Sequence, residues 1–253
     1  MHFKIIVKGM PLLTYLKGMP GFLREYREIR RQAEKSGNGF PFGKPYPCLA
    51  DKGQGSGVLA EHYFYQDLYC ARKVFQNNPA RHVDIGSRID GFVSHVASFR
   101  EIEVLDVRDL SPAIPGIRFN RADLTAKNFP LVDYCDSLSC LHAFEHFGLG
   151  RYGDPVDYDG HLVGWKNMHR MLKKGGKLYF SVPIGTQRIE FNAHRIFSIA
   201  YLLKLMDKRY SIDSFAYIND VQEFIADTAL DEASVRNNFG CLYGCGIFEL
   251  TKR

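Results

Sequence analysis

The chain has 253 residues, of which 45% are hydrophobic and 24% are charged. This is the composition of an ordinary globular protein, so a disordered, collagenous or fibrous chain is excluded. The 33 Lys and Arg against 28 Asp and Glu give a net charge of +5. Because this excess is small for the chain length, it does not require nucleic acid or another polyanion as a partner.

The cysteines and the N-terminal segment predict a cytoplasmic protein. The six cysteines include no CxxC pair, which favours reduced thiols. The segment MHFKIIVKGMPLLTYLKGMPGF is interrupted by Lys8, Pro11 and Lys17, so it lacks the continuous apolar core of a signal peptide. No run approaches the roughly 18 apolar residues of a membrane-spanning helix, so we expect no stable insertion into a membrane.

Residues 1–57 are predicted to form a helical appendage. A helix over 20–35 would begin at Pro20, with Phe22, Tyr26 and Ala33 on one side and many charges on the other. The segment 36–57, rich in Gly and Pro, is predicted to be a loop. Whether the helix packs on its own domain, a membrane surface or a partner is left open.

Residues 58–253 are predicted to form one α/β domain, because short apolar runs alternate with helical stretches. Helices are expected at 59–77, 90–98, 161–173 and 195–207. Strands are expected at 82–86, 102–107, 117–120, 132–138, 176–183, 211–217 and 245–251. This order favours a doubly wound, mostly parallel sheet of seven strands, with ligands beyond the carboxyl ends of the strands.

Three carboxylates at successive strand ends suggest an adenosine site. Asp84 lies in the first strand, which runs into a turn with Gly86 and Gly91, where the backbone can pass close to a nucleoside. Asp106 ends the second strand, where a carboxylate can bind both hydroxyls of a ribose. Asp123 follows the third strand and is placed to meet an adenine amino group.

The glycine turn favours S-adenosylmethionine over a nicotinamide cofactor. The turn also contains Ser87, and Arg88 takes the place of the middle glycine that a pyrophosphate requires. A carboxylate two residues before Gly86 suits a ligand with an ammonium group, which S-adenosylmethionine has. Taken alone, the turn is also compatible with a purely structural role.

The same residues carry a family resemblance. The order D-x-G, acidic second-strand end, Asp after the third strand and MLKKGGKLYFSVP resembles class I S-adenosylmethionine-dependent methyltransferases. The segments HYFYQDL, HVDIGSRIDGFVSHVASFR, SLSCLHAFEHFGLGRYGDP and FNAHRIFS are more narrowly similar to a bacterial family of unknown function, DUF268, found among genes for surface-polysaccharide synthesis. The resemblance implies a Rossmann-like sheet and S-adenosylmethionine as cofactor. It also implies that Tyr63 and Gln66 close over the methionine end of the cofactor.

The resemblance places the acceptor at the segment after the fourth strand. A hydroxyl acceptor must lose its proton as it attacks the methyl group, and His146, followed by His142, is the candidate base, with Glu145 as a residue that orients it. Histidines that only pack beneath the loop are the alternative.

The segment from His142 to His146 also reads HxxEH, a signature of zinc hydrolases when it lies on a helix. It follows a strand here and meets Gly148 soon after, so we expect no metal. A metal-dependent hydrolase remains the rival enzyme.

A loop rich in glycine and two following segments are predicted to bind the acceptor. The candidate residues are Arg151, Tyr152, Asp154, Arg188, Asn192, His194 and Arg195. Converging arginines would favour an anionic small molecule, such as a nucleotide-linked or phosphorylated sugar. The sequence thus predicts O-methylation of such an acceptor in glycan biosynthesis. A non-catalytic nucleotide-binding scaffold is the alternative outside enzymes, and the oligomeric state is left open.

Overall fold

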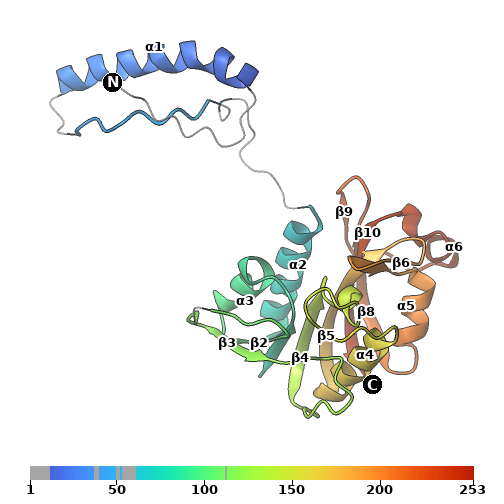
Figure 1. The fold of residues 1–253 in the computed structure, drawn as a ribbon. Helices are drawn as coiled ribbons and strands as arrows, with labels where there is room; N and C mark the ends of the chain where they lie inside the picture. Colours follow the sequence, from blue (N-terminus) through green and yellow to red (C-terminus); the bar gives the residue numbers. More distant parts are fainter. Residues whose placement is uncertain (1–11, 37–39, 50–51, 53–60, 112) are drawn as a thin grey trace. The chain divides into compact units, whose positions relative to one another are not determined.

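The computed structural model describes residues 12–36, 40–49, 52, 61–111 and 113–253. The chain divides into two compact units, residues 1–59 and residues 60–253, and each is described by itself (Figure 1). The predicted boundary between residues 57 and 58 lies outside the described residues.

The first unit contains one long helix, α1 (Leu12–Ser36). It begins eight residues before the predicted start, and Pro20 therefore lies inside it. Tyr26 stacks on Phe22 and meets Phe42 edge to face, so part of the predicted apolar side is covered. Ile29, on the same side, is 55% exposed. Among the described helices, α1 included, none combines the length and the hydropathy needed to cross a bilayer.

The second unit is built on an eight-stranded sheet in the order β3-β2-β1-β4-β5-β10-β8-β9. Its strands are β1 (His82–Ile85), β2 (Ile102–Asp106), β3 (Ile117–Arg121), β4 (Cys135–Leu141), β5 (Leu172–Ile184), β8 (Tyr210–Ile218), β9 (Phe224–Ile225) and β10 (Gly244–Lys252). The first five strands run parallel, and β10 lies antiparallel between β5 and β8. This confirms the predicted doubly wound sheet of class I methyltransferase type. The additional eighth strand, β9, is only two residues long and lies at the edge.

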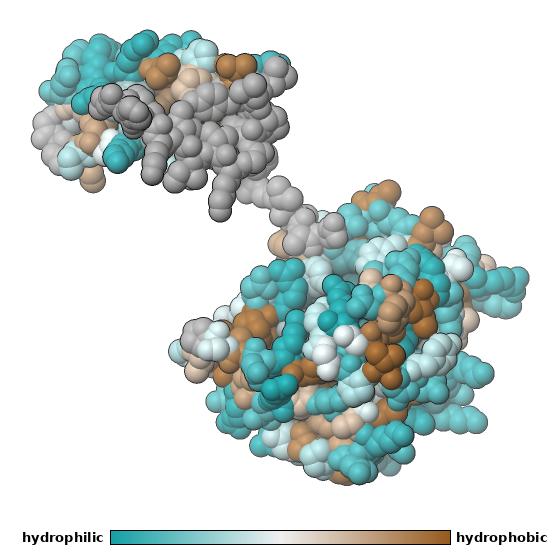
Figure 2. All heavy atoms as spheres, in the orientation of Figure 1, coloured by the Kyte–Doolittle hydropathy of each residue, from teal (hydrophilic) through white to brown (hydrophobic). Residues whose placement is uncertain are grey.

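Helices cover both faces of this sheet (Figure 1). They are α2 (Glu61–Asn77), η2 (Ile89–Val93) and α3 (Ser94–Ala97) on one face, and α4 (Gly160–Met171) and α5 (Ile199–Met206) on the other. Successive residues of β2 pack on opposite faces of the sheet, Val104 with the α2 cluster and Leu105 with the α4 cluster, so both faces of this strand are buried. On the surface shown in Figure 2, hydrophilic side chains cover most of this unit and hydrophobic ones form small separate patches.

Some predicted boundaries differ from the structure. β4 begins three residues later than predicted, because Val132 is exposed and Asp133 has a positive φ of 44°. β5 begins at Leu172, directly after α4, and its register against β4 shifts where it passes Lys173 to Gly176. The start of the predicted helix 195–207 is instead β7 (His194–Ile196), paired with β6 (Arg188–Glu190). Helix α5 starts only after Ser198, whose hydroxyl accepts a hydrogen bond from the backbone of Tyr201.

Short elements that were not predicted complete the second unit. They are η3 (Phe144–His146), α6 (Glu232–Arg236) and η4 (Asn238–Gly240).

His82 on β1 is expected to make the second unit sensitive to acid. The ring is buried between Ser137 and Ser139, whose hydroxyls lie 2.7 and 3.2 Å from its nitrogens. Burial, together with the charge of Arg100, lowers the pKa of His82 to about 3. An unfolded histidine titrates near 6.5, so below that pH the unfolded chain binds a proton that the folded chain excludes. Stability is therefore retained above pH 6.5 and lost progressively as the pH falls towards 3.

The expected loss from His82 alone is about 2 kcal/mol in the free energy of unfolding between pH 7 and pH 5. Urea unfolding at both pH values, for the wild type and for His82→Asn, isolates this contribution from those of other groups. Asparagine keeps hydrogen-bonding groups but cannot take up a proton, so the variant should lose less stability on acidification. An identical pH dependence in both proteins would contradict this assignment.

Candidate active site

A cavity of about 440 Å³ lies at the carboxyl ends of the parallel strands. Gly86 follows β1, Asp106 ends β2, Asp123 follows β3, and His142 follows β4, and all of them line it. This is where doubly wound sheets bind ligands, because the chain turns to opposite faces there and leaves a crevice. The volume is in the range of small-molecule sites.

One side of the cavity is formed by the turn after β1. Gly86 has a φ of +67°, and a Cβ at this position would lie 3.0 Å from the Cβ of Ala143. Only glycine satisfies both the backbone angle and the close approach. The backbone of the turn is therefore left open to the cavity.

The Asp106 carboxylate is held by Arg108. The guanidinium donates to both carboxylate oxygens, at 2.9 and 2.6 Å, and the backbone N–H of Arg108 donates to Oδ1 at 2.9 Å. The side chain of Asp106 is 11% exposed and that of Arg108 is 50% exposed. Oδ2 accepts only one of these bonds, so a ligand hydroxyl can still donate to Asp106.

Asp123 is only partly engaged by the protein. Its Oδ1 accepts hydrogen bonds from the backbone N–H and the hydroxyl of Thr125, both at 2.7 Å. These two bonds fix the carboxyl group and leave Oδ2 to accept from a ligand.

The opposite side of the cavity carries His142, Glu145 and His146, on and next to η3. The Glu145 Oε1 atom lies 2.8 Å from His142 Nδ1 and 3.7 Å from His146 Nε2. Burial by itself raises the pKa of Glu145, but His142, His146 and a backbone hydrogen bond together outweigh it and the pKa is lowered. Burial likewise tends to lower the pKa of His142, whereas Cys245 and Glu145 raise it well above the usual value.

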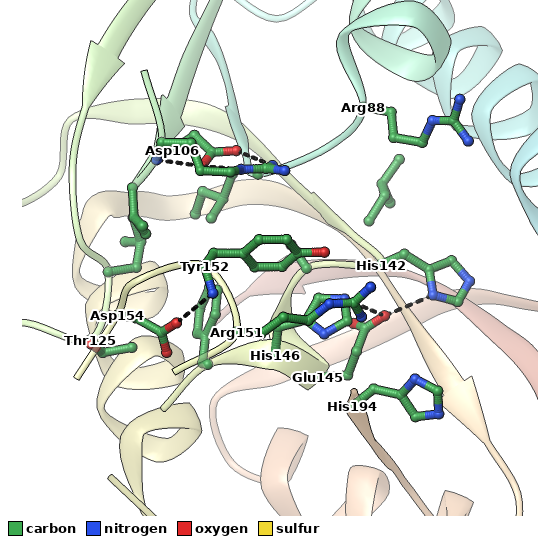
Figure 3. A pocket seen from close by; sticks show the side chains of 18 of the residues that line it. Arg88, Asp106, Thr125, His142, Glu145, His146, Arg151, Tyr152, Asp154 and His194 are labelled. Atoms are coloured by element: carbon green, nitrogen blue, oxygen red, sulfur yellow. Dashed lines mark hydrogen bonds and ion pairs between the residues drawn. The ribbon is translucent and has the colours of Figure 1, made fainter. Parts of the chain in front are cut away.

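His146 has one nitrogen bound to the protein and one facing the site. Its Nδ1 donates to the backbone carbonyl of Ala193 at 2.7 Å, which leaves Nε2 with a lone pair. Burial lowers the pKa of His146, although Glu145 acts in the opposite direction. The ring is 5.3 Å from that of Tyr152, over which the Arg108 guanidinium lies at 4.5 Å. Figure 3 shows the Tyr152 side chain between Asp106 and the histidines.

The loop between η3 and α4 is held by internal hydrogen bonds. The Asp154 carboxylate accepts from the backbone N–H groups of Gly148, Gly150 and Tyr152. Arg195 is buried and donates to the carbonyls of Phe147 and Tyr158 at 2.6 and 3.0 Å, with a longer contact to that of Glu145. These bonds fix the conformation of the loop, which forms one wall of the cavity.

Part of the chain matches a protein family of unknown function. Residues 118–238 match the model of DUF268. That family is described as Caenorhabditis proteins of unknown function. The predicted resemblance to DUF268 is thus confirmed over these residues, which make up slightly less than half of the chain. No curated protein has a significant sequence match to the chain.

Solved structures share the fold at low sequence identity. The YcgJ protein from Bacillus subtilis is 14% identical with a TM-score of 0.50, over 75% of this chain and 98% of its own. N-methyltransferase NodS from Bradyrhizobium japonicum, in complex with S-adenosyl-L-homocysteine, is 12% identical with a TM-score of 0.47, over 76% and 89%. The 1,6-didemethyltoxoflavin-N1-methyltransferase from Burkholderia thailandensis is 12% identical with a TM-score of 0.48, over 74% and 79%. At these identities the likeness shows the fold alone.

The second unit brings most of the predicted site residues together. The cavity is lined by Tyr63, Gly86, Asp106, Asp123, His142, Glu145, His146, Arg151, Tyr152, Asp154 and His194. It is not lined by Gln66, Asp84, Ser87, Gly91, Arg188, Asn192 or Arg195. Asp84, for example, is fully buried, and its carboxylate accepts from the backbone and hydroxyl of Ser87 and from the hydroxyl of Ser139. Asp84 therefore supports the glycine turn from the interior of the protein.

Five polar lining residues were not predicted as site residues: His62, Arg88, Arg108, Thr125 and Tyr243. Arg108 and Thr125 each lie two residues after a predicted carboxylate and bind it, so a search for local partners of Asp106 and Asp123 could have found them. Tyr243 comes from the turn before β10, which no local pattern connects to this cavity.

Proposed function

We propose that this chain is an S-adenosylmethionine-dependent methyltransferase that methylates an oxygen of a small anionic acceptor, such as a nucleotide-linked or phosphorylated sugar, in glycan biosynthesis. The observation that carries the proposal is one cavity with a nucleoside-type cradle on one side and a histidine with a free nitrogen on the other. The context of glycan synthesis comes from the family resemblance in the sequence.

The residues present fit the cofactor. Gly86 leaves the space that a Cβ would fill, the Asp106 carboxylate suits a ribose diol, and Asp123 Oδ2 suits an adenine amino group. S-adenosylmethionine supplies an activated methyl group when bound. Tyr63 lies beside His142, with ring centroids 5.2 Å apart, and would bound the site at the other end of the cofactor.

His146 is the proposed general base. The bond from its Nδ1 to the Ala193 carbonyl sets the tautomer in which Nε2 accepts a proton. Glu145, 3.7 Å from Nε2, would stabilise the imidazolium that results. His142 is a weaker candidate because its Nδ1 is bound to Glu145 and its side chain is only 4% exposed.

Arg151 is the proposed anchor for an anionic acceptor. Arg88 and Arg108 are each paired with a carboxylate, of Asp90 and Asp106. Arg151 also lines the cavity, but its guanidinium donates to the Ala193 carbonyl and, within the described part of the chain, forms no ion pair. Its uncompensated charge favours a phosphate or carboxylate.

Two measurements on the purified chain test the proposal. Calorimetry should detect binding of S-adenosylhomocysteine, and methyl-labelled S-adenosylmethionine should transfer its label to an acceptor among nucleotide-linked and phosphorylated sugars. Absence of binding by the folded protein would reject the methyltransferase. Binding without transfer to any such acceptor would favour the non-catalytic scaffold.

A further inference from the structure

Three buried side chains that can bind a metal meet behind the histidine side of the cavity. His62 comes from α2, His142 follows β4, and Cys245 comes from β10. One ligand atom of each, a ring nitrogen or the sulfur, lies within 4.8 Å of the other two. Their exposed fractions are 4%, 8% and 0%. Segments that are distant in the sequence thus bring two imidazoles and a thiol together in one buried cluster.

Two polar atoms in this cluster have no hydrogen-bond partner. Among the described residues, Nε2 of His62 and Nε2 of His142 are both buried and unpaired. A buried polar atom without a partner destabilises the folded chain, and two of them on rings whose centroids are 5.5 Å apart call for a shared explanation. A ligand that binds both nitrogens would supply it.

The surroundings of His142 are those of a metal-binding histidine. Its Nδ1 is 2.8 Å from Glu145 Oε1, so the carboxylate holds the ring and leaves Nε2 as the nitrogen that can bind a metal once it has lost its proton. Histidines that bind metals are oriented in this way by a carboxylate on the other nitrogen. Figure 3 shows this bond at the wall of the cavity.

The types of ligand atom in this cluster favour zinc. One thiolate and two imidazoles suit zinc, whereas calcium and magnesium prefer oxygen ligands. Zinc bonds of about 2.0–2.3 Å place neighbouring ligand atoms between 3 and 4 Å apart, so these side chains need to close by at most about 1.5 Å. Binding would release the thiol proton of Cys245 to solvent, because the thiolate is the ligand.

The site would keep one position open. His62 and His142 line the cavity, as does Tyr243, whose ring is 5.6 Å from that of His62. Three protein ligands next to a cavity are typical of zinc sites that take water or a substrate as the fourth ligand.

We propose that His62, His142 and Cys245 bind one zinc ion, whose fourth position opens into the cavity. This site shares His142 with the HxxEH signature but does not use His146, whose Nδ1 is bound to Ala193. It differs from the expectation, drawn from the sequence, that no metal binds. It does not depend on the proposed methyl transfer.

Wild-type protein gives the first test. After exposure to zinc and removal of loosely bound metal, elemental analysis should find about one zinc per chain. X-ray absorption at the zinc edge should show one sulfur, two imidazole nitrogens and one further light atom. Cobalt in place of zinc should give a thiolate-to-cobalt charge-transfer band. A folded protein that holds no zinc, or zinc without sulfur or with several sulfurs, would overturn the proposal.

Variants assign the ligands. Cys245→Ser and His62→Gln should each lower zinc retention at least tenfold, and Cys245→Ser should abolish the cobalt band. Cys241→Ser, a buried thiol outside the cluster, and His95→Gln, an exposed histidine on α3, serve as matched controls and should retain the metal. Loss of zinc in these controls, or retention in both ligand variants, would reject the assignment. Asp106→Ala should keep its zinc, so failure of the cofactor site and failure of the metal site are distinguishable.

Discussion

Replacing Asp106 by alanine is expected to weaken the binding of S-adenosylhomocysteine about 10- to 100-fold. A hydrogen bond to a charged group contributes about 1.5–3 kcal/mol, and 1.4 kcal/mol corresponds to a factor of ten in affinity. In the proposed complex the carboxylate accepts from two ribose hydroxyls, and alanine removes both bonds. Calorimetric titration of the wild type and the variant measures the change.

Asp109→Ala is the matched control for this experiment. Asp109 is also an aspartate after β2, but its side chain is 76% exposed and pairs with Arg121 rather than lining the cavity. Its replacement should leave the affinity unchanged. Equal affinities in wild type and Asp106→Ala would remove the ribose assignment, and with it the main support for the cofactor.

The fold could be predicted from the sequence because each strand can be recognised from its own residues. Strands of a parallel sheet are buried on both faces, so β2 and the later part of β5 are short runs made mostly of apolar residues. Asp106 and Asp123 were predicted for the same reason, because a strand end is visible in the sequence and the carboxyl ends of parallel strands share one edge.

What could not be predicted depends on contacts between distant segments. Cys245 meets His62 and His142 only because β10 inserts between β5 and β8, where Cys245 lies beside Pro183 and Ile218. The spacing of the cysteines along the chain gives no indication of this cluster.

For Arg195, the role suggested by the neighbouring residues in the sequence differs from its place in the folded chain. An arginine in a polar segment suggests an anion site, whereas the folded chain buries this guanidinium against backbone carbonyls of the loop. Burial of a charge is decided by the tertiary structure, since only carbonyl groups brought from elsewhere can satisfy its donors.

His146→Gln is expected to lower kcat about 100-fold or more while leaving the affinity for S-adenosylhomocysteine unchanged. A positioned general base contributes about 10²–10⁴ in rate. Glutamine can still donate to the Ala193 carbonyl, so the loop should keep its shape, but its amide cannot take the acceptor proton. Single-turnover rates together with calorimetry separate the chemical step from binding. His95→Gln, on the exposed surface of α3, is the control and should behave as wild type.

The pH profile distinguishes a base from a residue that only supports the loop. Burial lowers the pKa of His146, the Glu145 carboxylate raises it, and Arg151 and His142 lower it again, with a net decrease below 6.5. The titration of His146 should therefore leave the wild-type rate constant above pH 6.5. At lower pH the rate should fall, because protonated Nε2 can no longer accept a proton. In His146→Gln that acid limb should disappear. A variant that keeps the limb, or that reacts within about twofold of the wild-type rate, would assign proton removal to another group.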